Sequence, residues 1–447
     1  MSFEIKKSTQ FKINELSIVT KTGDAIDIQS IYEELNIFDS LFTPVMSGNI
    51  MIKDSVGLSG KLLFDGTEML LIDIVKDRNS EIGAFKKAFR IYKQSNRTNQ
   101  GLNSETYVLH FAADEILFSD QQKVNQSYEG TYSKVVGKIL TDYLKVPENN
   151  LGGIYEESVG IRKIVIPNLR PLEAIEWCAK RAIDANQAPN FMFFQNMVGF
   201  NFVTLSRLLS EIDILDVTIE PKNQSKGNPI FEMGAARGFE VVQQADSIEK
   251  IRSGINSGQF LGFDPITKTT AKKQINFDQI YNSMKHGNDN PNLTIQQNRV
   301  GKDAREAFDS KKTVSIFNSA QQLSAYIKKN DGNVLSVLDN METYLFQRKA
   351  IIDNLMSKRI KFVMPGNFQL STGFNVNVIA PNLGKKEKGG GDENLDPGLS
   401  GKYLIVASRQ MIGYDKHETI IEVATTSTNN EFIPASNPQQ NQAYLSY

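Results

Sequence analysis

One short stretch of the sequence decides the fold class: Ala88-Phe89-Arg90-Ile91-Tyr92-Lys93. Its polar and apolar residues alternate, which is typical of a strand with one buried and one exposed face. The segments 68–75 and 107–111 on either side are also rich in branched and aromatic residues, and Asn, Gly and Ser separate them, as at 96–104. The first quarter of the chain is therefore predicted to be a small antiparallel barrel or sandwich.

The last quarter of the chain is predicted to be β-structure again. The segment 374–378 alternates, and strands are expected at 403–409 and 419–424. Both β regions also share an order of features, in which a Gly-Asn segment precedes one strand and then two more: Gly48-Asn49-Ile50-Met51-Ile52 in the first, Gly366-Asn367-Phe368-Gln369-Leu370 in the second. Two interpretations stay open, a duplication of one barrel or the general likeness of β-meanders.

The middle of the chain is predicted to be α/β. Apolar residues recur at helical spacing over 131–144, and a second helix should follow Asn168, with Pro171 in its first turn. Two aromatic segments separated by Gly199 indicate a hairpin. A long helix is expected over 334–357.

These patterns together predict a β-rich α+β protein with two similar antiparallel β-barrel domains and an intervening α/β domain. The predicted divisions are a first barrel, an intermediate α/β domain made of two segments, a second barrel made of two segments, and an extended C-terminal tail: 1–115; 116–230 with 281–333; 231–280 with 334–428; 429–447. The polar region 283–332 and the charged, glycine-rich segment 385–397, a predicted hairpin loop, match no pattern.

Composition excludes several classes of protein. A formal net charge of -1 over 447 residues gives no global electrostatic signal for nucleic acid or for an anionic membrane. The first residues contain no apolar run of the kind found in a secretory signal, and no apolar run is long enough to span a bilayer. A single cysteine excludes an internal disulfide framework and a cysteine-based zinc site. We therefore expect no membrane insertion and no specific nucleic acid partner.

The histidines and the cysteine do not form a catalytic pattern. His110, His286 and His417 lie at no metal-ligand spacing, and each is expected to be structural or solvated. Cys178 lies on the apolar face of the predicted helix, where a thiol is inert. A nucleophilic Cys–His pair has no supporting signature.

Acidic pairs and glycine-rich segments are equally weak candidates. Adjacent carboxylates such as Glu33-Glu34 and Glu156-Glu157 point in different directions on a strand or a helix, unlike the paired acids of a glycosidase. The segment Gly254-Ile255-Asn256-Ser257-Gly258 is no P-loop, and Lys385–Lys388 is offset by neighbouring acids. We expect no enzymatic activity, no catalytic, cofactor-binding or metal-binding residues, and no cofactor.

The order and spacing of several segments resemble the baseplate central hub proteins of contractile-tailed (myovirus-type) bacteriophages, which are related to the hub region of type VI secretion spike proteins. The likeness covers about residues 30–425 in scattered patches. Its most specific part is a long helix followed by a "G-N-F-x-L-x-x-G" passage. The matching segments are 36–42, 47–54, 64–68, 168–177, 193–194, 199–205 and 366–373.

The resemblance implies a structural virion protein rather than an enzyme. It implies that both β-barrels are tube-like, and that three copies form a homotrimeric, pseudo-hexameric ring that connects the six-fold tail tube to the three-fold central spike. The implied partners are further copies of the chain, the tail tube protein, the central spike protein, other baseplate proteins and the tape measure protein. No spike or hydrolase domain is fused to the matching region, which favours a separate hub subunit in the phage tail baseplate, made in the host cytoplasm.

Alternatives remain open. The chain could be a tail-associated peptidoglycan hydrolase, a secretion-system spike hub, or a carbohydrate- or receptor-binding tail protein. Phe38, Phe42 and Phe64 are candidate interface anchors, because aromatic residues are enriched at interfaces, and equally candidates for the core.

Overall fold

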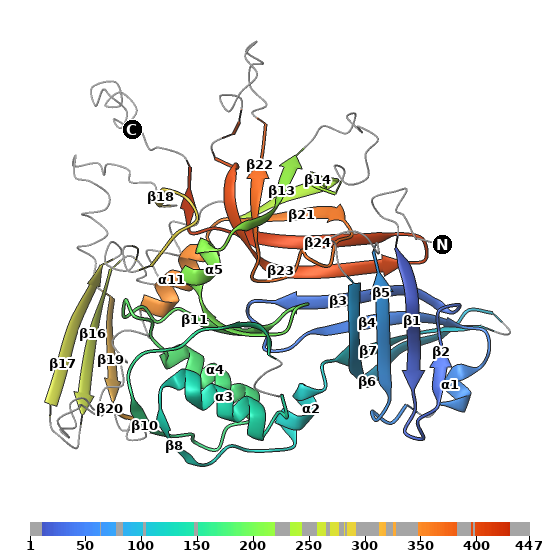
Figure 1. The fold of residues 1–447 in the computed structure, drawn as a ribbon, viewed down its shortest axis with the longest axis horizontal. Coiled ribbons are helices and arrows are strands. Elements are labelled where there is room, and N and C mark those ends of the chain that lie inside the picture. The colour runs from blue at the N-terminus through green and yellow to red at the C-terminus, as the bar shows by residue number, and fades with distance from the viewer. Residues whose placement is uncertain are drawn as a thin grey trace, which may run out of the picture.

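The fold is dominated by one 14-stranded sheet, seen at the centre and right of Figure 1. In this computed structural model the described residues are 11–62, 64–76, 84–101, 104–146, 151–219, 233–243, 257–264, 269–276, 281, 284–291, 313–318, 325–327, 347–381, 395–396 and 398–429.

The first half of the large sheet contains seven strands in the order β2-β1-β5-β6-β7-β4-β3, all antiparallel to their neighbours. The expected strands at 68–75, 88–93 and 107–111 are present. Every second residue of β5 is buried, as the alternating sequence predicts. The strands are β1 (Lys12–Val19), β2 (Ala25–Asp27), β3 (Tyr32–Ser40), β4 (Ser47–Asp54), β5 (Met69–Val75), β6 (Ala84–Asn99) and β7 (Glu105–Ala112).

The second half has the corresponding order β14-β13-β22-β23-β24-β21-β15. Strand β13 runs parallel to β14 and to β22, whereas the other neighbours are antiparallel. The strands are β13 (Asp213–Ile219), β14 (Ala235–Ala236), β15 (Gly238–Gln243), β21 (Arg359–Pro365), β22 (Asn375–Ile379), β23 (Gly401–Gly413) and β24 (His417–Ala424).

The two halves correspond in register as well as in strand order. In the ladder of β6 with β7 a bulge follows the second paired residue, Ile91. In the ladder of β23 with β24 a bulge follows the second paired residue, Ile405. A coincidence of strand order alone would not place a bulge at the same step, so the registers favour the duplication hypothesis. Two features depart from it. Strand β1 is antiparallel to β5 while β13 is parallel to β22. The β6–β7 ladder also has a second bulge, between Ser95 and Thr98, which the β23–β24 ladder lacks.

The segments that occupy equivalent places in the two halves differ from those that the sequence pattern aligned. The sequence pattern aligned the Gly-Asn segment at 48–52 with the one at 366–370. The first of these lies in β4, whose counterpart is β21, and the second is a loop that follows β21. Asn367 explains the loop, because its side-chain oxygen accepts from Gln369 N at 2.9 Å and so turns the chain.

No sheet formed by the described residues closes as a barrel, so two barrel domains are not confirmed; the protein is β-rich with large antiparallel sheets. In each half, two strands that follow one another in the chain pair with different neighbouring strands. After β2, which pairs with β1, the chain enters β3, which pairs with β4. After β14, which pairs with β13, the chain enters β15, which pairs with β21.

In the sequence, the two halves are separated by a region of helices and short strands, which lies at the bottom of Figure 1. The predicted helices and the hairpin are present, and Thr131 caps α3 by accepting from Lys134 N at 3.3 Å. The elements are α2 (Glu115–Asp120), β8 (Ser127–Gly130), α3 (Tyr132–Asp142), β9 (Gly152–Tyr155), β10 (Arg162–Val165), α4 (Pro171–Arg181), β11 (Phe191–Gln195), β12 (Phe200–Thr204) and α5 (Leu205–Ser210).

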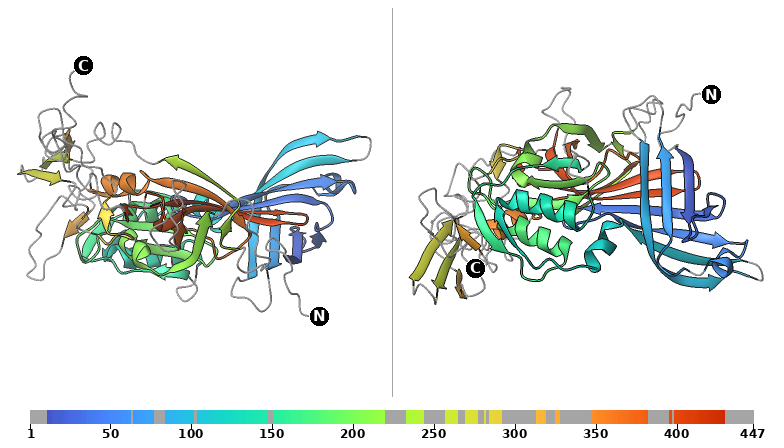
Figure 2. Two further views of the ribbon diagram at one scale, coloured as in Figure 1. Left: turned by 90° about the horizontal axis from the view of Figure 1, so that it is seen from above. Right: turned by 60° about the horizontal axis from the view of Figure 1, so that its bottom comes forward.

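The remaining elements are short. Strands β16, β17 and β19 form a separate sheet at the far end of the long axis from β1 (Figure 2). Of the long helix expected over 334–357, the described part contains only α11. The remaining bounds are α1 (Leu58–Lys61), β16 (Ser257–Asp264), β17 (Thr269–Asn276), β18 (Asn290–Pro291), β19 (Thr313–Asn318), β20 (Ala325–Ile327), α11 (Lys349–Leu355) and β25 (Ser427–Thr428).

The division into domains stays a prediction. Two observations differ from it. Strand β13 belongs to the range assigned to the intermediate domain but pairs with β22. Strand β16 belongs to the range assigned to the second barrel but pairs with β19 as well as with β17. Most of the polar region 283–332, nearly all of 385–397 and the tail from 430 onward lie outside the described residues.

The close packing of β3, β4 and β7 gives a first testable prediction. A Cβ added at Gly48 would lie 2.2 Å from the carbonyl oxygen of Asn36 and 2.3 Å from the Phe111 ring. Neither neighbour can move freely inside the sheet, so Gly48→Ala should destabilise the protein by about 1–3 kcal/mol. Urea unfolding followed by circular dichroism measures this change. Gly60→Ala is the matched control, since nothing lies within 4 Å of its added Cβ; equal midpoints for the two variants would contradict the prediction.

Candidate functional site

The feature most relevant to function is the ladder that joins the two halves. Strand β23 pairs antiparallel with β3, from Ala407 opposite Ser40 to Gly413 opposite Glu34. The pairing makes a continuous antiparallel sheet in the order β15-β21-β24-β23-β3-β4-β7-β6, which we call the shared sheet. One half of the duplicated pattern is thus hydrogen-bonded directly to the other.

One face of the shared sheet is polar and carries ion pairs between neighbouring strands. Arg409 on β23 lies 3.2 Å from Glu34 on β3 and donates to Asn36 Oδ1 at 2.8 Å. Arg359 on β21 lies 2.9 Å from Glu422 on β24. These groups are partly exposed, so each pair adds little stability.

The opposite face of the junction buries a carboxylate. Asp39 on β3 is 2% exposed and accepts hydrogen bonds from Ser371, Thr372 and Ser408, with Thr372 Oγ1 at 2.9 Å from Asp39 Oδ1. Burial raises the pKa of the Asp39 carboxyl above its ordinary value, although these hydrogen bonds oppose the rise. A buried carboxylate must be fully hydrogen-bonded to be tolerated, and here all of its partners belong to the second half of the chain.

A second buried polar cluster lies further along β23. Gln410 Nε2 donates to the carbonyl oxygens of Asn367 and Leu370, each at 3.2 Å. Its Oε1 accepts from Thr419 Oγ1 at 2.7 Å and lies 2.8 Å from His417 Nε2. Burial lowers the pKa of His417 well below its ordinary value, so this histidine is neutral and acts as a structural hydrogen-bonding group.

Both clusters bind the same loop, residues 366–373, which is the "G-N-F-x-L-x-x-G" passage. Its two apolar side chains enter different cores: Phe368 stacks on Phe85 of the first half with ring centroids 5.4 Å apart, and Leu370 packs in the core of the second half. A Cβ at Gly366 would lie 2.1 Å from the His417 ring, and Gly373 has a φ of 91°. Both glycines are therefore required by the geometry of the loop.

The same loop also holds the intermediate region. Asn196 Nδ2, in the turn between β11 and β12, donates to Thr372 O at 2.9 Å. Ser371 Oγ accepts from Met197 N at 3.1 Å. The loop 366–373 therefore contacts both halves of the duplicated pattern and the region between them.

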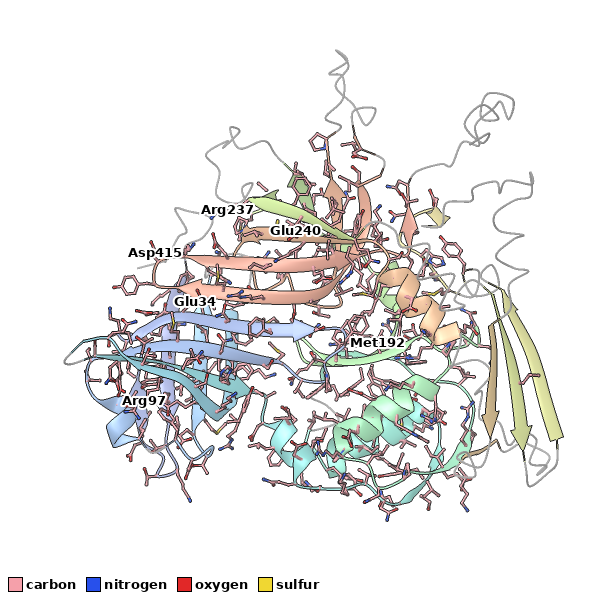
Figure 3. All side chains as sticks on the ribbon, turned by 180° about the vertical axis from the view of Figure 1, so that it is seen from behind. Glu34, Arg97, Met192, Arg237, Glu240 and Asp415 are labelled. Atoms are coloured by element: carbon pink, nitrogen blue, oxygen red, sulfur yellow. The ribbon has the colours of Figure 1, made fainter. Side chains whose placement is uncertain are left out.

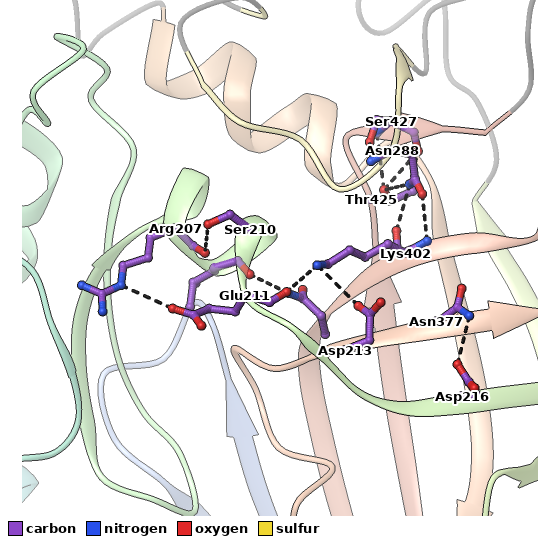
Figure 4. A network of polar contacts seen from close by, with 12 residues as sticks. Arg207, Ser210, Glu211, Asp213, Asp216, Asn288, Asn377, Lys402, Thr425 and Ser427 are labelled. Atoms are coloured by element: carbon purple, nitrogen blue, oxygen red, sulfur yellow. Dashed lines mark hydrogen bonds and ion pairs between the residues drawn. The ribbon is translucent and has the colours of Figure 1, made fainter.

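A further polar network fixes the start of β23 (Figure 4). Lys402 lies 3.5 Å from Asp213 of β13 and donates to the carbonyl oxygen of Glu211. Asn288 Nδ2 donates to Lys402 O at 3.0 Å, and Asn288 Oδ1 accepts from Lys402 N at 2.8 Å. This network holds Asn288, which belongs to the polar region 283–332, against the second half.

The shared sheet ends on two strands with free edges. Within the described residues, β15 pairs only with β21, and residues 92–99 of β6 pair only with β7; Ile91 N still donates to Glu68 O at 3.0 Å on the other side. Figure 3 labels Glu240 on β15 and Arg97 on β6, which lie at opposite margins of the sheet. An edge strand carries unpaired backbone groups that can pair with another chain.

The structure does not bring the candidate catalytic residues together. His110 bonds with Ser95 at 2.8 Å on the polar face, and His286 lies 2.8 Å from Thr426 Oγ1. Cys178 is buried in the core of the intermediate region.

The acidic candidates have structural partners. Glu34 contacts Arg409, and Glu156 accepts from Thr204 N at 2.9 Å. Gly254 lies outside the described residues, as do Lys385–Lys388. Among the residues that the structure describes, no three His, Cys, Asp or Glu side chains are placed to hold a metal ion, and no helix is both long and apolar enough to cross a membrane.

The three aromatic candidates differ in position. Phe64 packs on the first core, with its ring centroid 6.2 Å from that of Tyr107. Phe38 is half-buried on the polar face beneath the guanidinium of Arg409, 5.8 Å from the ring centroid. Phe42 is 43% exposed. Of the three, Phe42 is the one whose exposure leaves it open as an interface anchor.

No family model and no curated protein matches the chain. Among solved structures, the tail protein from Neisseria meningitidis MC58 shares 12% identity and a TM-score of 0.51, over 93% of this chain and 96% of that chain. The 43 kDa tail protein of prophage MuSo2 from Shewanella oneidensis shares 11% identity and a TM-score of 0.50, over 92% of this chain and 97% of that chain. The chain therefore has the fold of these phage tail proteins. An E. coli component of the type VI secretion system, at 10% identity over 96% of this chain and 80% of that chain, reaches a TM-score of only 0.40, from which we argue nothing.

The buried carboxylate gives a prediction about pH. Because the folded pKa of Asp39 is raised, its unfolded form ionises first as pH rises from about 4, and the folded state loses stability until the folded pKa is passed. Asp39→Asn removes this titration. The stability of Asp39→Asn relative to the wild type should therefore increase with pH, as measured by urea midpoints between pH 4 and pH 8. A difference that is constant across this range would show that the Asp39 pKa is not raised.

Proposed function

We propose that this chain is a structural subunit of a phage-type tail: a baseplate hub protein that forms a homotrimeric, pseudo-hexameric ring between the six-fold tail tube and the three-fold central spike. The observation that carries the proposal is the shared sheet, in which two corresponding half-sheets lie side by side in one chain. The fold shared with two phage tail proteins supports it.

The symmetry argument follows from the duplication. Homo-oligomers favour closed cyclic arrangements. Three copies of a chain with two similar halves present six similar half-sheets around one axis. Such a ring meets a six-fold partner through the features that the halves share, and a three-fold partner through those in which they differ, such as the direction of β1 and β13. In this proposal each half acts as one tube-like unit, although neither closes as a barrel by itself.

The proposal includes no catalytic activity. The carboxylates weighed as acids are engaged in structural contacts, Glu34 with Arg409 and Glu156 with Thr204. The proposed partners are further copies of this chain, the tail tube protein, the central spike protein, other baseplate proteins and the tape measure protein. These partners and the virion location come from the resemblance in sequence rather than from the geometry.

The proposal predicts the mass of the particle in solution. Size-exclusion chromatography with light scattering, over a series of concentrations, should give three times the chain mass of 50.1 kDa. Electron micrographs of that species should show a ring with six similar units. A monomer at every concentration, or a dimer with two-fold symmetry, would contradict the ring.

A separate experiment addresses the rival enzymatic function. The purified chain should leave the turbidity of a peptidoglycan suspension unchanged, with lysozyme as the positive control. If the chain clears the suspension, and the Glu156→Gln variant does not, the structural proposal would be wrong and a hydrolase would be favoured.

A further inference from the structure

Strand β13 carries exposed apolar side chains on its outer face. Leu215 and Val217 pack in the core of the second half. Ile214 alternates with them along the strand and therefore faces away from that core. Ile214 is 36% exposed, and Ile212, just before the strand, is 86% exposed. Two exposed isoleucines at neighbouring positions on one face indicate a surface that another segment covers.

The equivalent face of the first half is polar. Strands β1 and β5 occupy there the places of β13 and β22. The exposed residues of β1 are Lys12 and Asn14, and Asn14 Nδ2 donates to Asp73 Oδ1 on β5 at 3.1 Å. Lys86 on β6 lies 3.1 Å from Asp73. The exposed isoleucines are therefore not required by the half-sheet as such but are a property of the second half alone.

The described part of the chain ends close to this outer face. Asn429 is the last described residue, and its Nδ2 lies 3.0 Å from the position of a Cβ on Gly401, at the start of β23. The next residue of β23, Lys402, pairs with Asn377 of β22, which in turn pairs with Asp216 of β13. Asn377 Nδ2 donates to Asp216 Oδ1 at 2.9 Å in an exposed contact. This row leads from the place of Asn429 across the sheet to β13, and Figure 4 labels its three residues.

The segment 430–447 begins with residues that can reach β13. Neighbouring strands lie about 4.8 Å apart, so the crossing from β23 to β13 takes about 10 Å. Three extended residues, at about 3.3 Å each, span this distance. The third residue after Asn429 is Phe432, and Ile433 follows it; they are the first large apolar residues of the segment. The whole segment contains no Lys or Arg that would oppose docking on an apolar surface.

We propose that Phe432 and Ile433 dock on Ile212 and Ile214 of the same chain, so that the start of the segment 430–447 covers the outer face of β13. The contact lies within one copy, and the inference therefore does not rest on the proposed ring. The docked segment closes this face of the second half to other proteins, while the polar counterpart on the first half stays accessible.

Disulfide formation tests the contact directly. The variants Ile214→Cys/Phe432→Cys and Ile214→Cys/Ile433→Cys are oxidised and run on non-reducing gels, because two adjacent side chains can point in different directions. At least one of them should give an internal disulfide, seen as a faster-moving band of monomer size at every protein concentration. The absence of a disulfide from both variants would overturn the proposal.

A matched control and the wild type accompany these variants. Val165→Cys/Phe432→Cys should form no internal disulfide, because Val165 is similarly exposed, at 43%, but lies on β10 of the intermediate region. The buried Cys178 is common to all variants and is controlled by the wild type. Covalent dimers or trimers in place of the internal disulfide would show that the segment of another copy covers β13, and would also overturn the proposal.

Proteolysis tests the contact without cysteines. Chymotrypsin cuts after aromatic residues, so Phe432 and Tyr444 are both potential sites. Cleavage after Phe432 should be slower than after Tyr444 in the wild type. Ile214→Lys places a charge beneath the docked segment and should speed cleavage after Phe432 about tenfold or more, since cleavage follows the population of the undocked state. Val165→Lys should leave both rates unchanged.

The outcomes separate this inference from the proposed function. Equal rates of cleavage after Phe432 in the wild type and in Ile214→Lys would contradict the docking, whether or not the particle is a trimer. A monomer at every concentration that forms the internal disulfide would support the docking and contradict the ring.

Discussion

The structure depends on the ladder between β3 and β23. It is the contact through which two corresponding half-sheets become one shared sheet, and it brings together strands that are more than 360 residues apart in sequence. Such distant pairing is costly in chain entropy, because two segments far apart in the sequence must be brought together. Beneath the ladder, Asp39 is held by hydroxyl and backbone donors that all come from the second half of the chain, so its side chain ties the two halves together.

The loop 366–373 holds together the two halves and the region of helices and short strands. Its side chains divide between two cores, and its polar groups are used by the sheet and by the β11–β12 turn. Buried polar networks specify one arrangement better than an apolar surface would, because a shifted partner leaves groups unsatisfied. The loop therefore contacts both half-sheets and the β11–β12 turn at once.

Local patterns predicted six strands of the large sheet, two helices and the hairpin, because period-2 and helical spacing are set by neighbouring residues. They failed where distant contacts decide. Asp39, Ser408 and Gln410 are polar residues in strands, which normally marks an exposed face, and only the loop beneath them explains their burial. Likewise β13 pairs in parallel with β22, a strand about 160 residues later in the sequence. The exposure of Phe239 also depends on the order of strands in the sheet, which the sequence pattern does not give. For the same reason no composition or motif could have identified the free edges.

The direction of the hydrogen bonds in the β3–β23 ladder has a mechanical consequence. Backbone bonds in an antiparallel sheet run perpendicular to the strands. A pull along the strands loads all seven residue pairs of this ladder in shear at once, whereas a pull across the sheet opens them one after another. The protein should therefore resist tension far better along its strands than across them, and its toughness is anisotropic by construction.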